Sequence, residues 1–550
     1  MQRIEQLADE LGLAQAHVFQ WGRDRAKVAL EAVGKPRGKL VLVSAINPTP
    51  AGEGKTTMTV SLAMGLRRRG VKVAAALREP SLGPVFGVKG GGTGGGFATL
   101  EPEDAINLHF TGDIHAVTAA HNLLAALVDN AVVYRDAFAG QDLDARTITW
   151  PRVMDMNDRS LREMIIGLGG KGYGIPRQSR FDITAASEVM AILCLAENLR
   201  DLEQRCARIV VGTTRTGTPV TAADIGGASA MTALLKDALM PNLVQTKEGG
   251  PVFVHGGPFA NIAHGCNSVL ATRMALSHAD VVVTEGGFGF DLGGEKFLDI
   301  KCRQSGMAGG ESQLWPDLVV LVATTRALKY QGGVPVAGTT APNAEALTRG
   351  LDMLAKHLES VASFGLRALV VVNRFPTDVR EELVTIERFV REHGADFAEC
   401  EGFAKGGEGA LAFADRVQSA LTQERSAPRF TYALEASIED KLRAVATTIY
   451  GASDVVLTPS AREDLARIGE QKLPVCIAKT HLSLSDRATQ LGRPRDFVIT
   501  VRELRLAAGA GFIVALAGDI VTMPGLPKVP SARRVVVHED GHISGLMQGS

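Results

Sequence analysis

The feature that most constrains this chain is the alternation of short, β-branched apolar runs with helical stretches. Residues 40–46 (LVLVSAI) form one such run, and residues 71–77 (VKVAAAL) form the next, with a helix expected between them from about Lys55 to Arg69. This alternation is typical of a mainly parallel sheet flanked by helices. The pattern predicts an α/β fold, with further buried strands at residues 209–213, 280–284, 318–323 and 368–373.

Polar or Gly-containing segments follow these runs at once, at residues 78–81, 285–287 and 373–376. Ligands of α/β proteins lie beyond the carboxyl ends of the parallel strands. We therefore expect the functional site among these segments.

The length of 550 residues is too great for one hydrophobic core and predicts roughly three or four domains. We expect a large α/β unit over residues 1–300, an α/β domain over 301–425 and a C-terminal α/β domain over 426–550. The last boundary follows a change in composition near residues 425–428.

Charge and cysteine usage exclude several classes of function. Lys and Arg number 59 against 60 acidic residues, so neither a nucleic-acid footprint nor an anionic membrane surface is indicated. The N-terminus lacks the apolar core of a signal peptide, and no stretch approaches the ~18 apolar residues of a membrane span. The six cysteines are scattered without a CxxC pair, which argues against a zinc site or a disulfide framework. We expect a soluble, cytoplasmic protein.

The strongest local signal is a Gly-containing loop between the first strand and its helix, and it has the logic of a P-loop. Glycines let backbone amides turn toward phosphate oxygens, a lysine spans the β and γ phosphates, and a Thr hydroxyl can bind Mg²⁺. The strict motif has Gly at its first position, where this chain has Thr; the alternative is a Gly turn with a chance Lys-Thr pair. We predict an ATP phosphate site formed by Thr49, Pro50, Ala51, Gly52, Glu53, Gly54, Lys55 and Thr56.

The second signal follows the next strand. Arg78 stands at the strand end, and six glycines occur within residues 90–96. Such a segment favours neither helix nor strand, but it can cradle an anion or act as a hinge. Arg78, on a strand expected beside the P-loop strand, could bind a carboxylate or acyl phosphate bidentately. A flexible surface loop with a structural Arg–Glu pair is the alternative.

A third segment, residues 107–115 (NLHFTGDIH), carries two histidines and an aspartate near a glycine. It could position a metal-bound water or a phosphate, whereas a lone His is more often a hydrogen-bonded core residue. His255, His264 and Cys266 do not match the spacing of a standard zinc site.

Taken in order, these segments resemble those of formate–tetrahydrofolate ligases of the monofunctional bacterial type. The resemblance runs from the loop at 49–56 almost to the end of the chain. It includes residues 78–84, 90–96, 107–113, 256–267, 287–293, 296–297, 405–409 and 523–527.

The resemblance implies roles for particular residues. Residues 49–56 would bind ATP, with Lys55 and Arg78 catalytic, Thr56 on Mg²⁺ and Arg78 at a formyl phosphate intermediate. Phe375 and Phe403 would stack on the two faces of the pterin of tetrahydrofolate; many relatives have Trp where this chain has Phe403. The phosphate sites would lie in residues 1–300 and the folate aromatics in 301–425. The family also implies a homotetramer and a response to a monovalent cation, K⁺ or NH₄⁺.

The implied chemistry has two steps. Formate attacks the γ-phosphate of MgATP to give formyl phosphate and ADP, with charge neutralised by Lys55, Mg²⁺ and Arg78. The N10 amine of tetrahydrofolate then attacks the formyl carbon and expels phosphate. The sequence does not identify the group that removes the N10 proton.

Two other classes remain as alternatives. A P-loop switch or partitioning ATPase would explain the loop at 49–56, but it does not require Arg78 or the Gly-rich segment. A non-catalytic nucleotide-binding subunit is the second alternative. Neither would need formate and tetrahydrofolate together for ATP turnover.

Overall fold

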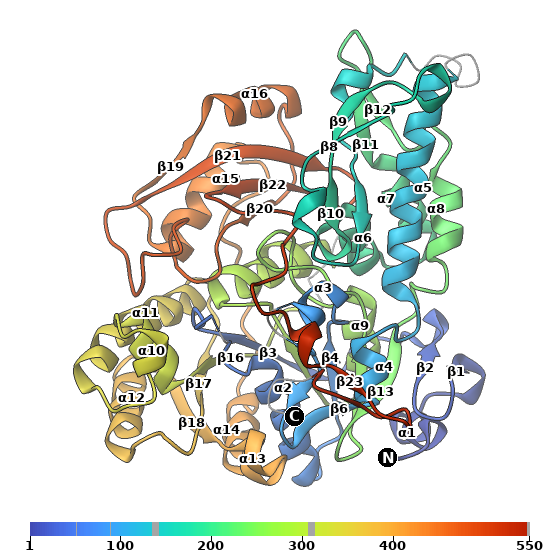
Figure 1. The fold of residues 1–550 in the computed structure, drawn as a ribbon. Helices are drawn as coiled ribbons and strands as arrows, with labels where there is room; N and C mark the ends of the chain where they lie inside the picture. Colours follow the sequence, from blue (N-terminus) through green and yellow to red (C-terminus); the bar gives the residue numbers. More distant parts are fainter. Residues whose placement is uncertain (51, 88–89, 135–141, 306–313, 547–550) are drawn as a thin grey trace.

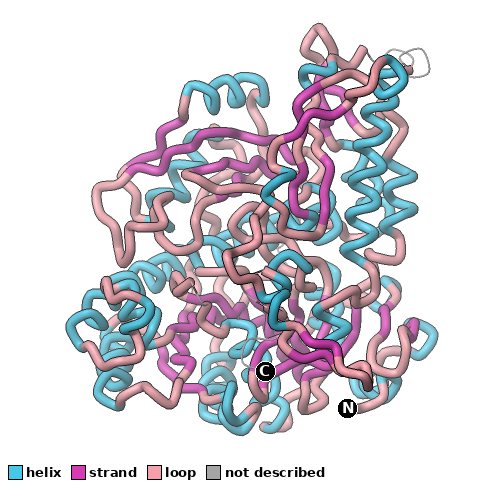
Figure 2. The backbone as a smooth tube through the Cα atoms, in the orientation of Figure 1, coloured by secondary structure: helices cyan, strands magenta, loops and turns pink. Residues whose placement is uncertain are grey.

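A twelve-stranded sheet occupies the lower half of the molecule in the computed structural model (Figure 1). The structure describes residues 1–50, 52–87, 90–134, 142–305 and 314–546. Figure 2 shows helices on both sides of this sheet, as expected for an α/β protein. The sheet runs in the order β1-β2-β13-β14-β4-β15-β3-β16-β17-β18, and β6 joins it through β13. Antiparallel pairing joins β1 (Val18–Gln20), β2 (Ala26–Val28), β13 (Asn242–Thr246) and β6 (Ala98–Glu101).

The strands from β14 to β18 are all parallel to one another and form the centre of the sheet. Their bounds are β14 (Pro251–Val254), β4 (Val73–Leu77), β15 (Val281–Glu285), β3 (Lys39–Ala45), β16 (Leu318–Ala323), β17 (Ala368–Asn373) and β18 (Asp396–Cys400). The strands predicted at 318–323 and 368–373 match β16 and β17, and the others in this sheet begin or end within two residues of their predicted bounds. A mainly parallel α/β sheet is thus confirmed.

Alternate residues of β3 enter two different cores. Val41 and Val43 pack with α2 (Lys55–Arg68) and α14 (Leu411–Leu421) on one face. Leu40 and Leu42 belong to the core on the other face, with α9 (Val269–His278) and α11 (Ala344–Ser363). Burial on both faces explains why the strand is a continuous apolar run without polar alternation.

The strand order differs from the prediction at one place. Arg78 was expected on a strand next to β3, but β15 lies between β4 and β3 and pairs with both. The segment from β3 through α2 to β4 is a parallel crossover that skips one position, and a strand more than 200 residues later in the chain fills it. Local sequence patterns specify a strand but not its neighbours, so this insertion was not predictable from them.

Two local expectations also need correction. Residues 210–213 form β11 (Val210–Thr213), but this strand pairs with β12 (Pro219–Thr221) in a separate antiparallel sheet. In the Gly-rich segment, β5 (Gly94–Gly95) pairs with β6 (Ala98–Glu101), although strand was not expected there. A Cβ on Gly94 would lie 2.2 Å from the carbonyl oxygen of Ala98, so only glycine permits this close pairing.

A second unit near the C-terminus contains a four-stranded sheet of order β19-β21-β22-β20. These strands are β19 (Asp454–Leu457), β21 (Val498–Ala507), β22 (Phe512–Ala517) and β20 (Val475–Ala478), with α15 (Ile438–Val445) and α16 (Pro459–Ile468) beside them. Lys479, directly after β20, forms a fully buried ion pair of 2.7 Å with Asp291, which follows β15 of the main sheet. The second unit is therefore fixed against the edge of the main sheet where β15 ends.

A third group of elements, at the upper right of Figure 1, is built around α5 (Asp113–Val133), α6 (Glu188–Leu195), α7 (Leu199–Arg208) and α8 (Ala228–Leu235). Within the described ranges, α5 alone is long and apolar enough to cross a membrane, so the expectation that no stretch approaches such a span needs correction. Its Asp113 forms a buried ion pair with Lys27 at 2.7 Å, and its Asp129 pairs with Arg152 and Arg177. These contacts, and its apolar residues in the main core, identify α5 as a helix packed within the protein.

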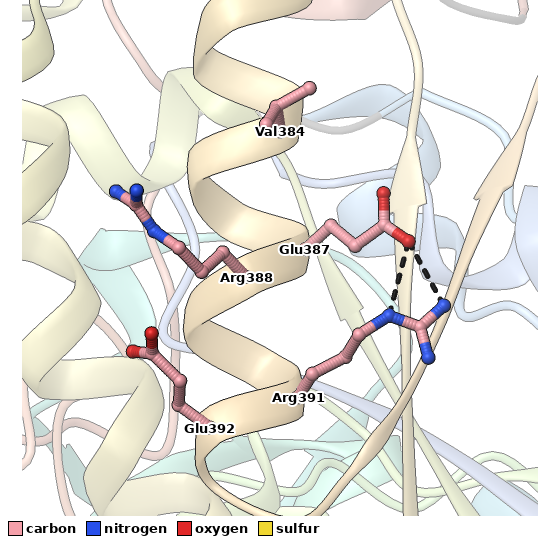
Figure 3. Close-up of a pocket in the computed structure, with 5 residues that line it drawn as sticks. All are labelled: Val384, Glu387, Arg388, Arg391 and Glu392. Carbon is pink, nitrogen blue, oxygen red and sulfur yellow. Dashed lines mark hydrogen bonds and ion pairs between the residues drawn. The ribbon is translucent and has the colours of Figure 1, made fainter.

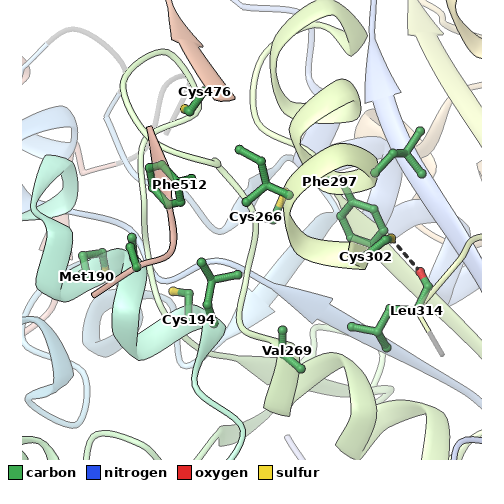
Figure 4. Packing of buried hydrophobic residues seen from close by; sticks show 14 of the residues in the cluster. Met190, Cys194, Cys266, Val269, Phe297, Cys302, Leu314, Cys476 and Phe512 are labelled. Carbon is green, nitrogen blue, oxygen red and sulfur yellow. Dashed lines mark hydrogen bonds between the residues drawn. The ribbon is translucent and has the colours of Figure 1, made fainter. Parts of the chain in front are cut away.

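The six cysteines lie in the interior, and the described structure contains no disulfide. Figure 4 shows four of them, Cys194, Cys266, Cys302 and Cys476, among apolar side chains from separate elements. Burial raises the pKa of the Cys266 thiol to about 11, so it is protonated at neutral pH. These thiols act as small core residues.

Candidate functional site

The parallel strands of the main sheet end at a common edge, and the predicted site residues follow them there. β3 leads into the phosphate loop (residues 49–56), β4 into Arg78, β17 into Phe375 and β18 into Phe403. The fold therefore gathers at one edge residues that are far apart in the sequence, as the carboxyl-end rule for α/β sheets requires.

Two glycines shape the phosphate loop. Gly52 has φ 86° and Gly54 has φ 71°, both in the left-handed region that favours glycine. The N–H of Gly52 donates to the carbonyl of Thr49 at 3.0 Å, which closes the turn. Pro50 and Gly52 are exposed, and Ala51 lies outside the described residues.

Glu53 differs from the other loop residues because its side chain points into the protein. Its carboxylate accepts a hydrogen bond of 2.6 Å from the N–H of Thr49 and another from the hydroxyl of Thr324. The side-chain amide of Asn373 donates to the Glu53 carbonyl at 3.1 Å. Burial raises the pKa of Glu53 above its ordinary value. Glu53 thus braces the loop against the ends of β16 and β17.

The first two residues of α2 face the end of β15. Lys55 donates from Nζ to the carbonyl of Phe288 at 3.1 Å, and the Thr56 hydroxyl donates to Oε2 of Glu285 at 3.0 Å. Phe288 holds a left-handed backbone, φ 57°, which is uncommon for a residue with a large side chain. Its ring stacks on His481 of the C-terminal unit, with ring centroids 4.2 Å apart.

Glu285 lies in a segment expected near the site, 285–287, but the sequence analysis assigned it no role. It ends β15, only 4% exposed, and its carboxylate lies between Thr56 and Arg78. A carboxylate directly after a buried Val-Val-Val-Thr run was the available signal. The position of Glu285 between Thr56 and Arg78 was not predictable, because the sequence does not show that β15 inserts between β3 and β4.

Arg78 is held by two neighbours, through Nη1 and Nη2 of its guanidinium group. Nη1 donates to the carbonyl of Pro258 at 3.1 Å, and Nη2 lies 3.5 Å from Oε1 of Glu285. Its buried Nε has no hydrogen-bond partner in the part of the chain that the structure describes. Nearby, burial together with the charges of Lys301, Lys296 and Arg78 lowers the pKa of His264 to about 3. These three cations thus lie near His264, while Glu285 is the carboxylate that faces Arg78.

Backbone N–H groups of the Gly-rich segment donate hydrogen bonds to two other parts of the chain. The N–H of Gly92 donates to Oδ1 of Asn107 at 2.7 Å, and the N–H of Gly91 donates to the carbonyl of Leu546 at 2.8 Å. Val88 and Lys89, which precede this segment, lie outside the described residues. Asn107, which belongs to the segment 107–115, thus holds the Gly-rich segment 90–96 in place through a hydrogen bond.

The two predicted folate aromatics are held by different elements. Arg326, on α10 (Thr325–Gln331), covers one face of the half-buried Phe375, with its guanidinium carbon 4.0 Å from the ring centroid. Phe403, on α13 (Gly402–Lys405), is 44% exposed and packs on Gly95 and Gly96. No ring contact joins Phe375 to Phe403 among the residues described. The structure brings the two rings to one edge of the sheet without stacking them.

Comparison with known proteins decides the family. The family model described as formate–tetrahydrofolate ligase matches residues 1–547. A curated formate–tetrahydrofolate ligase of Myxococcus xanthus (strain DK1622) is 61% identical over 549 residues, which cover 98% of this chain and 98% of that protein. This chain belongs to the formate–tetrahydrofolate ligase family. The resemblance inferred from the motifs is confirmed.

In this ligase the histidines of the third motif form a surface pair. Nε2 of His115 lies 3.2 Å from Nδ1 of His109, and the two rings stack. Asp113 of the same motif is instead buried against Lys27. The described residues contain no group of three or more His, Cys, Asp or Glu side chains that could hold a metal ion.

A surface depression on α12 (Arg380–Glu392) is separate from the site (Figure 3). Its lining residues lie along one face of this helix and are Val384, Glu387, Arg388, Arg391 and Glu392. Arg391 pairs with Glu387 at 2.9 Å. None of the lining residues follows the carboxyl end of a strand. None of them is among the residues predicted for the site.

Proposed function

We propose that this chain is an ATP-dependent ligase that converts formate and tetrahydrofolate to 10-formyltetrahydrofolate, ADP and phosphate. The observation that carries the proposal is the family match over residues 1–547. The meeting of Lys55, Thr56 and Arg78 at one sheet edge supports it, because phosphoryl transfer depends on cations placed around the transferred group.

The loop at residues 49–56 is the proposed P-loop for the ATP phosphates. The left-handed glycines and the start of α2 at Lys55 fit this role, since exposed amides at a helix N-terminus favour phosphate. The half-buried Thr56 hydroxyl at the same helix start is a suitable ligand for Mg²⁺. Mg²⁺ on the nucleotide would neutralise phosphate charge.

Lys55 and Arg78 divide the charge stabilisation in the proposed mechanism. Lys55 would leave the Phe288 carbonyl for the β and γ phosphates, a short movement at the loop itself. Arg78 would bind the formyl phosphate made when formate attacks the γ-phosphate. Its buried Nε, without a partner among the described residues, supports an anion as its missing neighbour.

The proposed folate site lies beyond β17 and β18. Phe375 and Phe403 each offer a flat apolar face for the pterin, and Arg326 leaves only one face of Phe375 open. The amine N10 would then attack the formyl carbon and release phosphate. The two rings would close on the pterin when it binds.

Several further properties of the family carry over only as proposals. We propose the division of labour expected above: phosphate chemistry in residues 1–300, folate aromatics in 301–425, and a C-terminal domain in 426–550. A response to K⁺ or NH₄⁺ and a cytoplasmic location rest on the family resemblance.

A homotetramer belongs with these proposals. An exposed apolar group near the C-terminal end of α5 supports contact with a second copy of the chain. It comprises Tyr134, Ile165, Leu168 and Tyr173, each more than 60% exposed. Sedimentation of the wild-type chain beside a variant with these four side chains changed to Ser would test the surface.

A coupled assay with each component omitted in turn tests the function. We expect folate formylation and ADP release only when MgATP, formate and tetrahydrofolate are all present. ATP hydrolysis that is indifferent to formate and folate would favour a P-loop switch ATPase. ATP binding without turnover under any of these conditions would favour a non-catalytic nucleotide-binding subunit.

A further inference from the structure

The position of β15 places one carboxylate between the two parts of the phosphate site. β15 pairs with β3 on one side, where Glu285 is opposite Val43, and with β4 on the other, where Thr284 is opposite Ala76. Its last residue, Glu285, therefore lies between the phosphate loop after β3 and Arg78 after β4.

The two carboxylate oxygens of Glu285 serve different partners. Oε2 accepts the hydrogen bond from the Thr56 hydroxyl at 3.0 Å, and Oε1 faces Nη2 of Arg78 at 3.5 Å. The Glu285 side chain is 5% exposed, whereas that of Arg78 is 22% exposed. One buried acid thus contacts both the hydroxyl suited to Mg²⁺ and the arginine suited to the acyl phosphate.

We propose that Glu285 exchanges Arg78 for the divalent cation of the bound nucleotide, and that this exchange releases Arg78 to bind the acyl phosphate. The inference rests on the proposed function and adds an order to it: the metal–nucleotide complex binds before the acyl phosphate site is complete. Glu285 is then a metal ligand together with Thr56, and a positioning residue for Arg78.

Charge and geometry favour the exchange. A divalent cation attracts a carboxylate about twice as strongly as a guanidinium does at equal distance. Mg²⁺ prefers oxygen ligands and is commonly held by one or two carboxylates or hydroxyls beside the phosphates. The Arg78 contact is the longer of the two that Glu285 makes, so it is the one more easily given up.

Arg78 gains from release only when an anion replaces Glu285. Nη1 would still donate to the Pro258 carbonyl, whereas Nη2 and Nε would then have no acceptor among the residues described. An acyl phosphate offers several charged oxygens, and Arg binds such groups bidentately. Without metal and nucleotide, Glu285 keeps Arg78 neutralised, and formate and phosphate compounds find no free cation there.

The experiment compares wild type with Glu285→Gln, which keeps the side-chain size but removes the negative charge. Titration calorimetry measures ADP affinity with Mg²⁺ and with EDTA. It also measures, with and without MgADP, the affinity of a phosphonate analogue of formyl phosphate, whose phosphorus–carbon bond prevents phosphoryl transfer to ADP. In wild type we expect Mg²⁺ to strengthen ADP binding and MgADP to strengthen phosphonate binding, each by about tenfold or more. In Glu285→Gln both enhancements should fall below about threefold, because metal binding is lost and Arg78 is already released.

The opposite results are equally definite. A variant in which Mg²⁺ still strengthens ADP binding as in wild type would remove Glu285 from the metal site. A variant whose phosphonate binding still requires MgADP would overturn the release of Arg78. If Glu285→Gln does not fold, Glu285→Asp keeps the charge on a shorter side chain and should give intermediate enhancements; unchanged ones would also overturn the proposal.

A matched control separates this role from mere support of the fold. Glu382 is a buried acid, 3% exposed, that pairs with Lys329 at 3.0 Å on α10 and α12. Glu382→Gln should lower the melting temperature and leave both enhancements unchanged. Wild-type protein that fails to formylate tetrahydrofolate would refute the proposed function itself, whereas normal formylation with an unchanged Mg²⁺ response in Glu285→Gln refutes this inference alone.

Discussion

The phosphate end and the folate end of the sheet edge are built in different ways. At the ends of β3, β4 and β15, charged side chains are anchored by hydrogen bonds to residues far away in the sequence, as Glu53, Glu285 and Arg78 show. At the ends of β17 and β18, two aromatic rings lie partly exposed, and no ring contact joins them in the ranges described.

The proposed roles explain this difference, because each end would bind a different kind of ligand. Transferring a phosphoryl group requires charges already in place, since reorganising them during the reaction raises the barrier. A flat pterin needs only apolar faces, and its binding can bring the rings together at small cost. We therefore expect substitutions at the phosphate end to lower kcat and substitutions at the folate end to raise KM.

The largest effect is expected for Lys55→Ala. Loss of the cation at the transferred phosphoryl group should lower kcat by about 100-fold or more, with the melting temperature unchanged. Lys236→Ala, at an exposed lysine 66% accessible on its side chain, is the control and should leave kcat as in wild type. Near-normal turnover of Lys55→Ala would remove the loop at 49–56 from the ATP site.

Arg78→Ala should come next. Most formylation and most ATP synthesis from ADP and carbamoyl phosphate (a mimic of formyl phosphate) should be lost, because one charge-assisted hydrogen bond to the acyl phosphate is worth about 1.5–3 kcal/mol. ADP affinity should change less than about threefold. Arg78→Lys, which keeps the charge but not the bidentate geometry, should recover only part of the activity. Weakened ADP binding with the mimic reaction intact would assign Arg78 to the nucleotide.

Truncation of Phe375 or Phe403 to Ala should have a moderate effect on folate alone. Stacking on each ring is worth roughly 0.5–1.5 kcal/mol beyond area burial, so with lost apolar contact KM for tetrahydrofolate should rise around tenfold. KM for ATP and formate should stay constant, and Phe403→Trp should keep or improve folate affinity.

Stability measurements separate folate binding from a core role for these rings. Truncation of a core Phe costs roughly 3–5 kcal/mol, which melting curves detect. Phe19→Ala, at a ring 49% exposed on β1 (Val18–Gln20), is a control of similar exposure away from β17 and β18. A large fall in melting temperature with an unchanged folate KM would show that Phe375 and Phe403 hold the fold.

The smallest effect is expected for Gly95→Ala. The added Cβ would lie 3.1 Å from Cε2 of Phe403, so the ring must shift by a few tenths of an ångström. KM for tetrahydrofolate should rise about two- to threefold, because a small displacement costs only part of one stacking contact. Gly227→Ala, whose Cβ would meet Leu127 at 3.2 Å away from the site, should leave KM constant.

The contrast between the two ends also explains what sequence reasoning found. The loop at 49–56, Arg78 and Phe375 follow strands that were predicted from their own apolar runs, whereas Phe403 was named from the family resemblance alone, since no strand was predicted before it. The roles of all these residues stay predictions. The inward direction of the Glu53 side chain was not predicted, because it depends on contacts with Thr324 and Asn373, which lie at the ends of β16 and β17. The role of Asn107 in holding Gly92 was likewise not evident from either motif.

By itself, the sequence determined the α/β class, five of the seven strands in the parallel centre of the main sheet, the glycine-shaped loop and the family. These depend on patterns within a few residues, where backbone sterics and the periodicity of burial act locally. Only the tertiary structure decided the order of the strands. Thr56 and Glu285 are 229 residues apart, and Arg78 and Glu285 are 207 apart. Their meeting follows from β15 pairing with both β3 and β4, a choice set by packing across the whole sheet.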